Sequence, residues 1–519
     1  MTKARQIRIE IDRLRNLFPE AEWRGVPPPV LAGVSDDSRE AAEGVAFVAI
    51  VGFQTDGHLY LGQARQAGAA LLVVERGHVA EHPELLEPVR DAPVMLVSNT
   101  RRAVAVLADE SYGHPSRDMR VHGVTGTKGK TTIVHLVAGI LKAAGRRPAT
   151  MGTLGVEFGD ERRTSALTTP GPIEVQRQMR LMADAGVTDL ACEVSAHAGA
   201  LSRTAPVRFE TITYTNLSRD HLDDFTPEEY LAAKLMIARD AAEVNPEVSG
   251  IGNARDQHTR AFLEPIDPSR RILFAAFAEG EDASDPPCDI SALILKRSPR
   301  ELQLELRGPD WVRHVALPLV GRFNAENAAA AAAIAHATGI EPDIIANGLS
   351  GAQPIPGRLE RVDQGQAFLV IVDYAHAPQP ALEALSGLRE MTSGRLIGVM
   401  GAGGDRDRGK RPLIGEILAS QCDIAVITSD NPRSEEPLDI INDILVGARR
   451  LGDRGAEVIV EPDRKKAIGA ALERAQEGDT VAILGKGHET YQIFRDKTIH
   501  FDDREVVREW LGEHGWSGA

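Results

Sequence analysis

A phosphate-binding loop is indicated by the stretch TGTKGKTT (125–132), which lies between an apolar stretch and a long apolar-periodic stretch. We expect these to form a strand and a helix, so that backbone N–H groups and the positive end of the helix dipole face a phosphate. Lys130 would reach the β- and γ-phosphates, and the Thr131 hydroxyl would coordinate Mg²⁺. The spacing departs from GxxxxGK[ST], because Val124 stands in place of the first glycine and Gly126 is the first glycine present.

Two further polar residues are expected where neighbouring strands end. Glu193 lies in EVSAH and His221 in SRDHLD, each after an apolar stretch. Because ligands of parallel sheets bind beyond the carboxyl ends of the strands, Thr131, Glu193 and His221 would form a metal–phosphate site for Mg²⁺. Taken alone, a glutamate and a histidine at strand ends are more often structural. Lys234, on the predicted helix EEYLAAK, has the pattern of a surface lysine.

Three Gly-containing polar loops follow apolar strands in the last third of the chain: GGDRDRGKR, DNPR and GKGHE. Arg406 and Arg433 would each bind a carboxylate with a guanidinium fork, and Glu489 would hold an ammonium group. Together with Asn431 they suit a zwitterionic amino acid. Solvated surface loops with ordinary ion pairs are the alternative.

The elements that would position these residues form an α/β protein with three domains. Strand–helix–strand succession predicts a central doubly wound parallel sheet, a second doubly wound sheet after it and a smaller α/β domain before it. The expected boundaries are 1–113, 114–354 and 355–519. A polar linker is predicted over 109–119, and the alanine-rich run 324–339 is predicted to be one close-packed helix.

Composition excludes several classes of protein. The chain has 519 residues and a formal charge of −16, which argues against non-specific binding to nucleic acid or anionic membrane. Its three cysteines are far apart, which excludes a disulfide framework and fits a reducing cytoplasm. The charged N-terminus does not resemble a secretory signal, and no apolar run is long enough to span a membrane. We therefore expect a soluble, cytoplasmic, multidomain protein without membrane insertion.

In its order of motifs the chain resembles the Mur ligases, the ATP-dependent amide-forming enzymes of peptidoglycan synthesis. The motifs that carry this resemblance are DSR, DGH, GTKGKTT, TTP, EVSAH, SRDH, EEYLAAK, GRFNAEN, PGRLE, DYAHAP, GAGGDRDRGKRP, DNPRSEEP and GKGHETYQ. The resemblance covers nearly the whole length. It implies a UDP-binding first domain, an ATP-binding central domain and an amino-acid-binding last domain.

The resemblance also implies roles for individual residues. The ATP-binding set is Gly126, Thr127, Lys128, Gly129, Lys130, Thr131, Thr132, Asn327, Arg358, Asp373 and His376. The UDP-substrate set is Ser38, Thr168, Thr169, Ser195 and Arg203. The amino-acid set is Arg406, Asp430, Asn431, Arg433, Gly485 and Glu489. The catalytic set is Lys130, Lys234, His221 and Glu193, with Lys234 carbamylated so that it helps Thr131, Glu193 and His221 to place two Mg²⁺ ions.

The implied reaction adds meso-diaminopimelate to the D-Glu γ-carboxylate of UDP-N-acetylmuramoyl-L-Ala-D-Glu. ATP converts the carboxylate to an acyl phosphate, whose leaving group is phosphate, and the amine of diaminopimelate then attacks. The implied partners are these small molecules, with no nucleic acid, and a monomer is expected. Because ATP and the amino acid belong to different domains, closure of the last domain is expected before chemistry.

The chain departs from the usual family pattern at Ala196, where serine is frequent, at Leu201, where glutamine is common, and at Lys128, where asparagine is frequent. The first two departures affect individual UDP-sugar contacts rather than the reaction class. Three alternatives stay open: an enzyme that adds L-lysine or another diamino acid, a folylpoly-γ-glutamate synthetase, and a non-catalytic nucleotide-gated scaffold for cell-wall enzymes.

Overall fold

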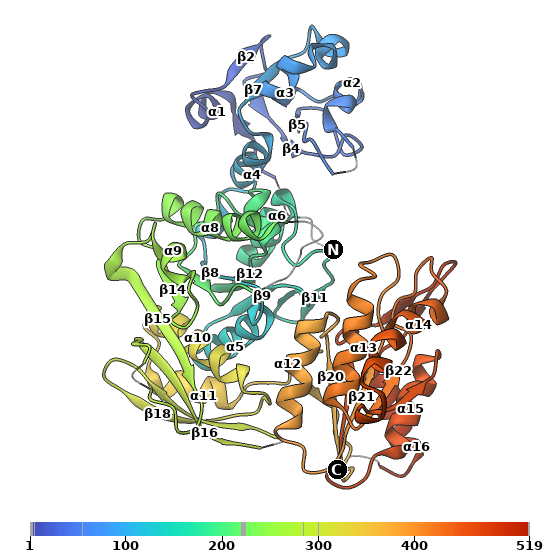
Figure 1. Ribbon diagram of the computed structural model, residues 1–519. Helices are drawn as coiled ribbons and strands as arrows, with labels where there is room; N and C mark the ends of the chain where they lie inside the picture. Colours follow the sequence, from blue (N-terminus) through green and yellow to red (C-terminus); the bar gives the residue numbers. More distant parts are fainter. Residues whose placement is uncertain are drawn as a thin grey trace. The chain divides into compact units, whose positions relative to one another are not determined.

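The structure, a computed structural model, describes residues 4, 6–53, 55–218, 225–283, 285–298 and 300–516. The chain divides into two compact units. Figure 1 labels its helices and strands. The first unit contains Met1–Ala275, Pro286–Ile290 and Ala330–Ile345, and the second contains Ala276–Asp285, Ser291–Ala329 and Ala346–Ala519. Within the described ranges, no helix is both long and apolar enough to cross a bilayer.

The first unit opens with a five-stranded sheet in the order β2-β7-β6-β5-β4. Its strands are β2 (Glu22–Arg24), β4 (Gly33–Ser35), β5 (Val45–Val48), β6 (Leu71–Glu75) and β7 (Val94–Val97), and its helices are α1 (Ile11–Leu17), α2 (Leu61–Gln66), α3 (Arg76–Glu81) and α4 (Thr100–Ser111). Leu14 and Leu107, from α1 and α4, pack in one core cluster. Leu61 and Val79, from α2 and α3, pack in another. The smaller α/β domain expected from the sequence is thus present.

The predicted linker 109–119 is partly wrong, because α4 continues to Ser111. Its last acidic residues are held by partners from elsewhere: Arg13 Nη2 donates to Glu110 Oε1 over 3.0 Å, and His114 Nδ1 lies 2.6 Å from Asp109 Oδ2. These contacts make polar residues suitable for a buried helix end. Polarity alone therefore gave a misleading indication of a loop.

A larger sheet follows in the same unit, in the order β11-β10-β9-β12-β8-β13-β14-β15. Its strands are β8 (Arg120–Thr125), β9 (Pro148–Gly152), β10 (Gly155–Phe158), β11 (Glu161–Arg163), β12 (Asp189–Glu193), β13 (Thr211–Tyr214), β14 (Ser249–Asn253) and β15 (Arg271–Phe277). Six neighbouring strands of this sheet run parallel, in the order β9, β12, β8, β13, β14 and β15. In register, Val124 lies opposite both Glu193 and Thr213, so the strand ends that carry the predicted site lie side by side.

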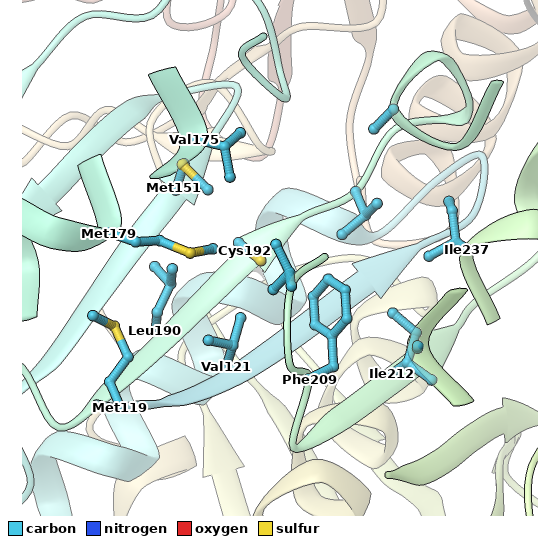
Figure 2. Close-up of a cluster of buried hydrophobic side chains, with 14 of the residues drawn as sticks. Met119, Val121, Met151, Val175, Met179, Leu190, Cys192, Phe209, Ile212 and Ile237 are labelled. Carbon is cyan, nitrogen blue, oxygen red and sulfur yellow. The ribbon is translucent and has the colours of Figure 1, made fainter. Parts of the chain in front are cut away.

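The core of this sheet is formed by apolar side chains on one of its faces and by the helices that cover it (Figure 2). Val121, Leu190 and Ile212 come from the strands, while Met179 comes from α6 (Pro172–Asp184) and Ile237 from α8 (Pro227–Val244). These residues are at most 1% exposed, so a closely packed core supports the strands from which the loops at the carboxyl edge extend.

The second unit contains an antiparallel meander and a six-stranded sheet. The meander consists of β16 (Ile290–Arg297), β17 (Leu302–Arg307) and β18 (Val312–Leu317). The chain continues through α10 (Phe323–Ala337), the helix predicted from the alanine run, and α11 (Pro342–Ser350).

The six-stranded sheet has the order β19-β20-β24-β21-β22-β23. Its strands are β19 (Glu360–Arg361), β20 (Leu369–Asp373), β21 (Leu396–Met400), β22 (Ile424–Ile427), β23 (Glu457–Val460) and β24 (Thr480–Leu484). One core cluster draws on α12 (Pro378–Arg389), α13 (Lys410–Gln421) and α14 (Pro437–Ala448), and the other on α15 (Arg464–Arg474) and α16 (Asp503–Glu513). The prediction of a second doubly wound sheet is confirmed.

Candidate functional site

The loop between β8 and α5 (Lys130–Ala143) has the backbone geometry that its glycines require. Gly126 has φ 141°, and a Cβ there would lie 1.9 Å from Thr215 Oγ1. Gly129, with φ 87°, directly precedes the helix. Lys130 Nζ donates to the carbonyl oxygens of Gly126 over 2.8 Å and Thr127 over 2.9 Å, so its ammonium lies over the loop. A phosphate held by this loop would meet that cation at once.

The loop is fastened to the segment after β13 by a set of short hydrogen bonds. Thr127 N donates to Asn216 O over 2.9 Å, and Lys128 N donates to Asn216 Oδ1 over 3.0 Å. Thr127 Oγ1 accepts a hydrogen bond from Ser218 N over 3.0 Å. Asn216 is therefore a supporting residue of the loop. Asn216 lies in the polar stretch TNLSRDHLD that is expected at a strand end, but no role was predicted for this residue.

Glu193 lies at the centre of a small polar cluster at the end of β12. It is only 2% exposed, and its Oε1 accepts from Thr131 Oγ1 over 2.9 Å and from Thr153 N over 2.8 Å. Thr153 Oγ1 donates to Oε2 over 3.1 Å and lies 3.2 Å from Thr168 Oγ1. The structure thus brings three predicted residues together, and Thr153 is an additional one that had no motif of its own.

This cluster fits a magnesium ion by the chemistry of its donors. A hydroxyl and a carboxylate oxygen lie 2.9 Å apart beside the predicted phosphate loop. Both are the hard oxygen ligands that Mg²⁺ prefers, and the ion usually binds through few protein groups plus phosphate and water. His221, predicted as a third ligand, lies outside the described residues.

The predicted UDP-substrate residues Thr169, Ser195 and Arg203 are linked to the same strand end. Thr169 Oγ1 donates to Glu193 O over 2.9 Å and accepts from Ser195 N over 3.0 Å. Arg203 Nη1 donates to Thr169 O over 2.7 Å. Burial, followed by the nearby charge of Arg101, lowers the pKa of Arg203. The metal side and the substrate side of the predicted site therefore share one hydrogen-bonded network.

Lys234 is fully buried on α8, so the surface pattern suggested by its helix is wrong. Its Nζ lies 4.3 Å from the centroid of the Tyr230 ring, and the Tyr230 hydroxyl lies 3.4 Å from Thr127 Oγ1. The short helix α7 (Ala196–Ala200), capped by Ser195, packs closely on α8, because a Cβ at Gly199 would lie 2.0 Å from Ala233 O. Tyr230 thus connects the phosphate loop with the predicted carbamylation site.

The structure does not join every predicted residue to this cluster. Thr132 is buried on α5. Ser38 lies in the loop after β4, where its hydroxyl donates to Gln63 Oε1 over 3.4 Å. Its role at the UDP substrate stays a prediction.

Among the described residues, Asp56, His58 and His78 form the only group of three or more His, Cys, Asp or Glu side chains whose ligand atoms lie within 4.8 Å of one another. His58 Nε2 accepts the backbone N–H of Glu75 over 3.2 Å, so the ring proton belongs on Nδ1, which lies 2.7 Å from Asp56 Oδ1. His78 Nε2 lies 2.7 Å from Asp56 Oδ2. Since both nitrogens of His58 are engaged, we interpret the cluster as structural, because it links Asp56 to the backbone of Glu75.

In the second unit, the two predicted carboxylate-binding arginines surround Gly403. A Cβ at Gly403 would lie 2.9 Å from Arg433 Nη1, 3.8 Å from Arg406 Cγ and 3.9 Å from Asn431 O. Arg433 adopts φ 53° and donates from Nη1 to Gly404 O over 2.8 Å. The structure thus brings the loops after β21 and β22 together, as the sequence predicts, and glycine leaves room between the two side chains.

The loops after β22 and β24 meet through Asn431 and Glu489. Asn431 Nδ2 donates to Glu489 Oε2 over 3.0 Å. Lys486 Nζ donates to the same oxygen over 3.0 Å and to Asn431 Oδ1 over 3.3 Å. Asp430 is buried, and a Cβ at Gly485 would lie 2.6 Å from its Oδ2, so glycine is required for this close approach. The sequence analysis did not assign Lys486 a role.

Arg464 holds the starts of these two loops. It is fully buried on α15, and it donates to Asp503 Oδ1 and Oδ2 over 2.8 Å each. It also donates to Ser429 O over 3.2 Å and to Leu484 O over 3.0 Å, which directly precede Asp430 and Gly485. No motif near Arg464 indicated this role, since the loops that it holds are remote in sequence.

The predicted nucleotide residues of this unit lie near the end of β20. Asp373 Oδ2 accepts from Leu359 N over 2.6 Å, and burial raises the pKa of its carboxyl group. The Arg358 guanidinium lies 5.1 Å from the centroid of the Tyr374 ring. The centroid of the His376 ring lies 4.6 Å from that of the Tyr374 ring. These residues form one group. Asn327 lies on α10, where its Nδ2 donates to Asn324 Oδ1 over 2.8 Å.

Known proteins resemble the chain over nearly its whole length. The chain matches the Mur ligase family, catalytic domain, over residues 30–112; the Mur ligase middle domain over 124–335; and the Mur ligase, glutamate ligase domain, over 357–487. The UDP-N-acetylmuramoyl-L-alanyl-D-glutamate–2,6-diaminopimelate ligase of Syntrophomonas wolfei is 39% identical, and the match covers 96% of this chain and 98% of that relative. The ligase of the same name from Aquifex aeolicus is also 39% identical, with 94% and 95% covered.

Solved structures show the same likeness. A structure of UDP-N-acetylmuramoyl-L-alanyl-D-glutamate–2,6-diaminopimelate ligase matches with a TM-score of 0.67 and 28% identity, covering 93% of this chain and 95% of that one. A MurF ligase from Thermotoga maritima in complex with ADP, 20% identical with a TM-score of 0.55, shares the fold. With its phosphate loop, its polar strand ends and relatives matched over nearly their full length, the chain belongs to the Mur ligase family of ATP-dependent, ADP-forming amide ligases.

Proposed function

We propose that this enzyme adds meso-diaminopimelate to the γ-carboxylate of the D-Glu residue of UDP-N-acetylmuramoyl-L-Ala-D-Glu. The observation that carries the proposal is a cluster of side chains from three loops: Arg406, Arg433 and Asn431 lie around Gly403, and Glu489 is hydrogen-bonded to Asn431. This set of charges suits a substrate with ammonium and carboxylate groups at its far end. Relatives named for diaminopimelate addition and matched over 92–98% of either chain support it.

The first chemical step transfers the γ-phosphoryl group of ATP to the substrate carboxylate. Lys130 neutralises charge on the phosphates, and the N–H groups of the loop around Gly126 and Gly129 bind them. Thr131 and Glu193 would hold Mg²⁺, with His221 and a carbamate on Lys234 as further candidates for a second ion. When bound, Mg²⁺ offsets the repulsion between the carboxylate and the triphosphate.

The second step forms the amide. The acyl phosphate is attacked by the free amine of diaminopimelate, and phosphate leaves with the electrons of the broken C–O bond. Arg433 and Glu489 would hold the remote end of the amino acid, so that the reacting amine is positioned rather than activated. Thr168, Thr169, Ser195 and Arg203 would hold the muramoyl-dipeptide, with Ser38 near its UDP group.

A carbamate on Lys234 is proposed because its Nζ is buried beside the ring of Tyr230. The hydroxyl of Tyr230 in turn lies near Thr127 of the phosphate loop. Addition of CO₂ to the neutral amine would convert a potential cation into an anion with two oxygen donors. Such a group attracts a metal ion, whereas an ammonium would repel it. Retention of the modification can be measured on the intact protein by mass spectrometry at neutral pH.

The proposed substrate is tested with a panel of amino acids in a ligation assay. The enzyme, ATP, Mg²⁺ and UDP-N-acetylmuramoyl-L-Ala-D-Glu are incubated with meso-diaminopimelate, L-lysine, L-ornithine or L-glutamate, and the release of ADP and the mass of the product are measured. We expect product with diaminopimelate. Product with lysine but not diaminopimelate would overturn the specificity and leave the reaction class unchanged. Absence of ADP release with every amino acid would overturn the function.

A further inference from the structure

A buried lysine lies beneath the residues expected to receive the amino acid. Lys486, on the loop after β24, is 0% exposed, and its Nζ donates to Glu489 Oε2 over 3.0 Å and to Asn431 Oδ1 over 3.3 Å. We propose that Lys486 is a positioning residue that determines the affinity for the diamino acid, because it holds Glu489 and Asn431 in one arrangement. The inference rests on the proposed function, since it assigns Glu489 to the substrate's ammonium group.

Hydrogen bonds fix the orientations of the Glu489 and Asn431 side chains. Glu489 Oε2 accepts from both Lys486 Nζ and Asn431 Nδ2, each over 3.0 Å. The orientation of the Asn431 amide is determined as well, because its Oδ1 accepts from Ile493 N over 3.0 Å and from the lysine. The Tyr491 side chain also hydrogen-bonds the Glu489 carboxylate, so Lys486, Asn431 and Tyr491 together fix its orientation towards a substrate ammonium group.

Burial makes the arrangement stiff. The side chain of Glu489 is 16% exposed and that of Lys486 is 0% exposed, so the pair is open to a ligand only on the glutamate side. A buried ammonium is costly unless it is paired and hydrogen-bonded. Lys486 therefore cannot leave its partners without a penalty. Its Nζ also lies 5.4 Å from the centroid of the Tyr491 ring, which closes a further side of the cation.

Lys486 also supplies the positive charge that is paired with the Glu489 carboxylate. Without Lys486, the carboxylate of Glu489 would lose a cation and a donor, and Asn431 Oδ1 would lose a donor. Removal of one member of a buried hydrogen-bonded charge pair leaves the other without its partner, so Glu489 and Asn431 would lose the arrangement that receives the substrate. The affected quantity should be the affinity for the diamino acid, because ATP and the muramoyl-dipeptide are assigned to residues of other loops.

The test compares Lys486→Met, Glu489→Gln and the double variant in the full chain. Lys486→Met removes the cation and its donors while it keeps an unbranched side chain that is only one atom shorter. We expect KM for meso-diaminopimelate to rise about tenfold or more, with KM for ATP and for the UDP substrate changed less than about twofold. In the Glu489→Gln background the same substitution should have a much smaller effect, because the charge that it serves is gone.

The matched control is Lys465→Met, since Lys465 is an exposed lysine of the same unit whose Nζ lies 2.7 Å from Glu509 Oε2. It should leave all three KM values unchanged. Lys486→Gln restores one amide donor without the charge and should recover part of the lost affinity. Equal increases in all KM values, an additive double variant, or loss of folding in both Lys486 variants would overturn the inference in favour of a structural lysine.

The two proposals fail in different ways. If the unmodified chain releases no ADP with any amino acid, the proposed function is wrong. If the unmodified chain ligates diaminopimelate and Lys486→Met does so with the same KM, only the role of Lys486 is wrong.

Discussion

The hydroxyl of Thr131 donates to Glu193 Oε1 over 2.9 Å, so the first turn of α5 and the end of β12 meet at one buried carboxylate. Thr131 and Glu193 are 62 residues apart and come together because β8 and β12 are adjacent parallel strands. We proposed above that this pair holds the metal ion that contacts a phosphate bound by the loop. Two predictions concern this edge of the sheet and two concern the second unit.

Lys130→Ala should abolish ligation. The Lys130 ammonium lies over the loop carbonyls and is the charge expected at the β- and γ-phosphates. Loss of charge stabilisation in a phosphoryl transfer typically costs a factor of 10² or more in kcat. ADP release with all substrates present measures the effect. Lys142→Ala, an exposed lysine of the same helix, is the control, and near-normal turnover of Lys130→Ala would contradict the phosphate role.

Glu193→Gln should raise the Mg²⁺ concentration needed for activity and lower the maximal rate. The amide keeps the size of the side chain but removes the charge and replaces one oxygen by an N–H donor, which faces the Thr131 hydroxyl and the Thr153 N–H. A titration of ADP release with Mg²⁺ measures both changes, and Glu157→Gln on β10 is the control. An unchanged Mg²⁺ dependence would remove Glu193 from the metal site.

Arg433→Met should reduce kcat/KM for meso-diaminopimelate about 100-fold or more while it affects L-lysine far less. The reason is that lysine lacks the second carboxylate, which is the group that the guanidinium would bind. Parallel ligation assays with the two amino acids give the ratio. Arg495→Met is a suitable control, since Arg495 is an exposed arginine of the same unit, with 64% of its side chain accessible. A uniform loss with both amino acids would place Arg433 in the framework of the loop instead.

His488 should make the unfolding free energy depend on pH. Burial, with the nearby charges of Arg358 and Arg504, lowers the pKa of His488 from 6.5 to about 4. The unfolded chain therefore binds a proton at higher pH than the folded chain, so this contribution to stability is complete above pH about 6.5 and is lost as the pH falls towards about 4. Urea unfolding across that range should show a smaller slope for His488→Gln, whereas exposed His82→Gln should retain the full slope.

The sequence allowed the fold and much of the site to be predicted, because glycine patterns and polar strand ends are local signals. The strand, loop and helix around Gly126 and the convergence of Arg406 with Arg433 follow from such signals. The roles of Thr153 and Lys486 could not be predicted in the same way. Thr153 contacts Glu193, 40 residues away, and Lys486 joins its near neighbour Glu489 to Asn431, 55 residues away.

The two incorrect expectations have the same physical cause. A surface position is the ordinary interpretation of a helical lysine such as Lys234, and the linker over 109–119 was predicted from polar residues together with Gly and Pro. Polar residues indicate exposure only when they have no buried partner. Asp109 and Glu110 have such partners in His114 and Arg13. Lys234 lies against an aromatic ring inside the unit.

The guanidinium of Arg464 reaches the peptide carbonyls at which two separate loops begin, and it is itself fixed by Asp503. Whatever displaces one loop must therefore displace the other. Substitutions in α15 or α16 that do not contact a ligand should therefore change which amino acid the enzyme accepts. Substrate preference would then depend on these two helices as well as on the residues that contact the amino acid.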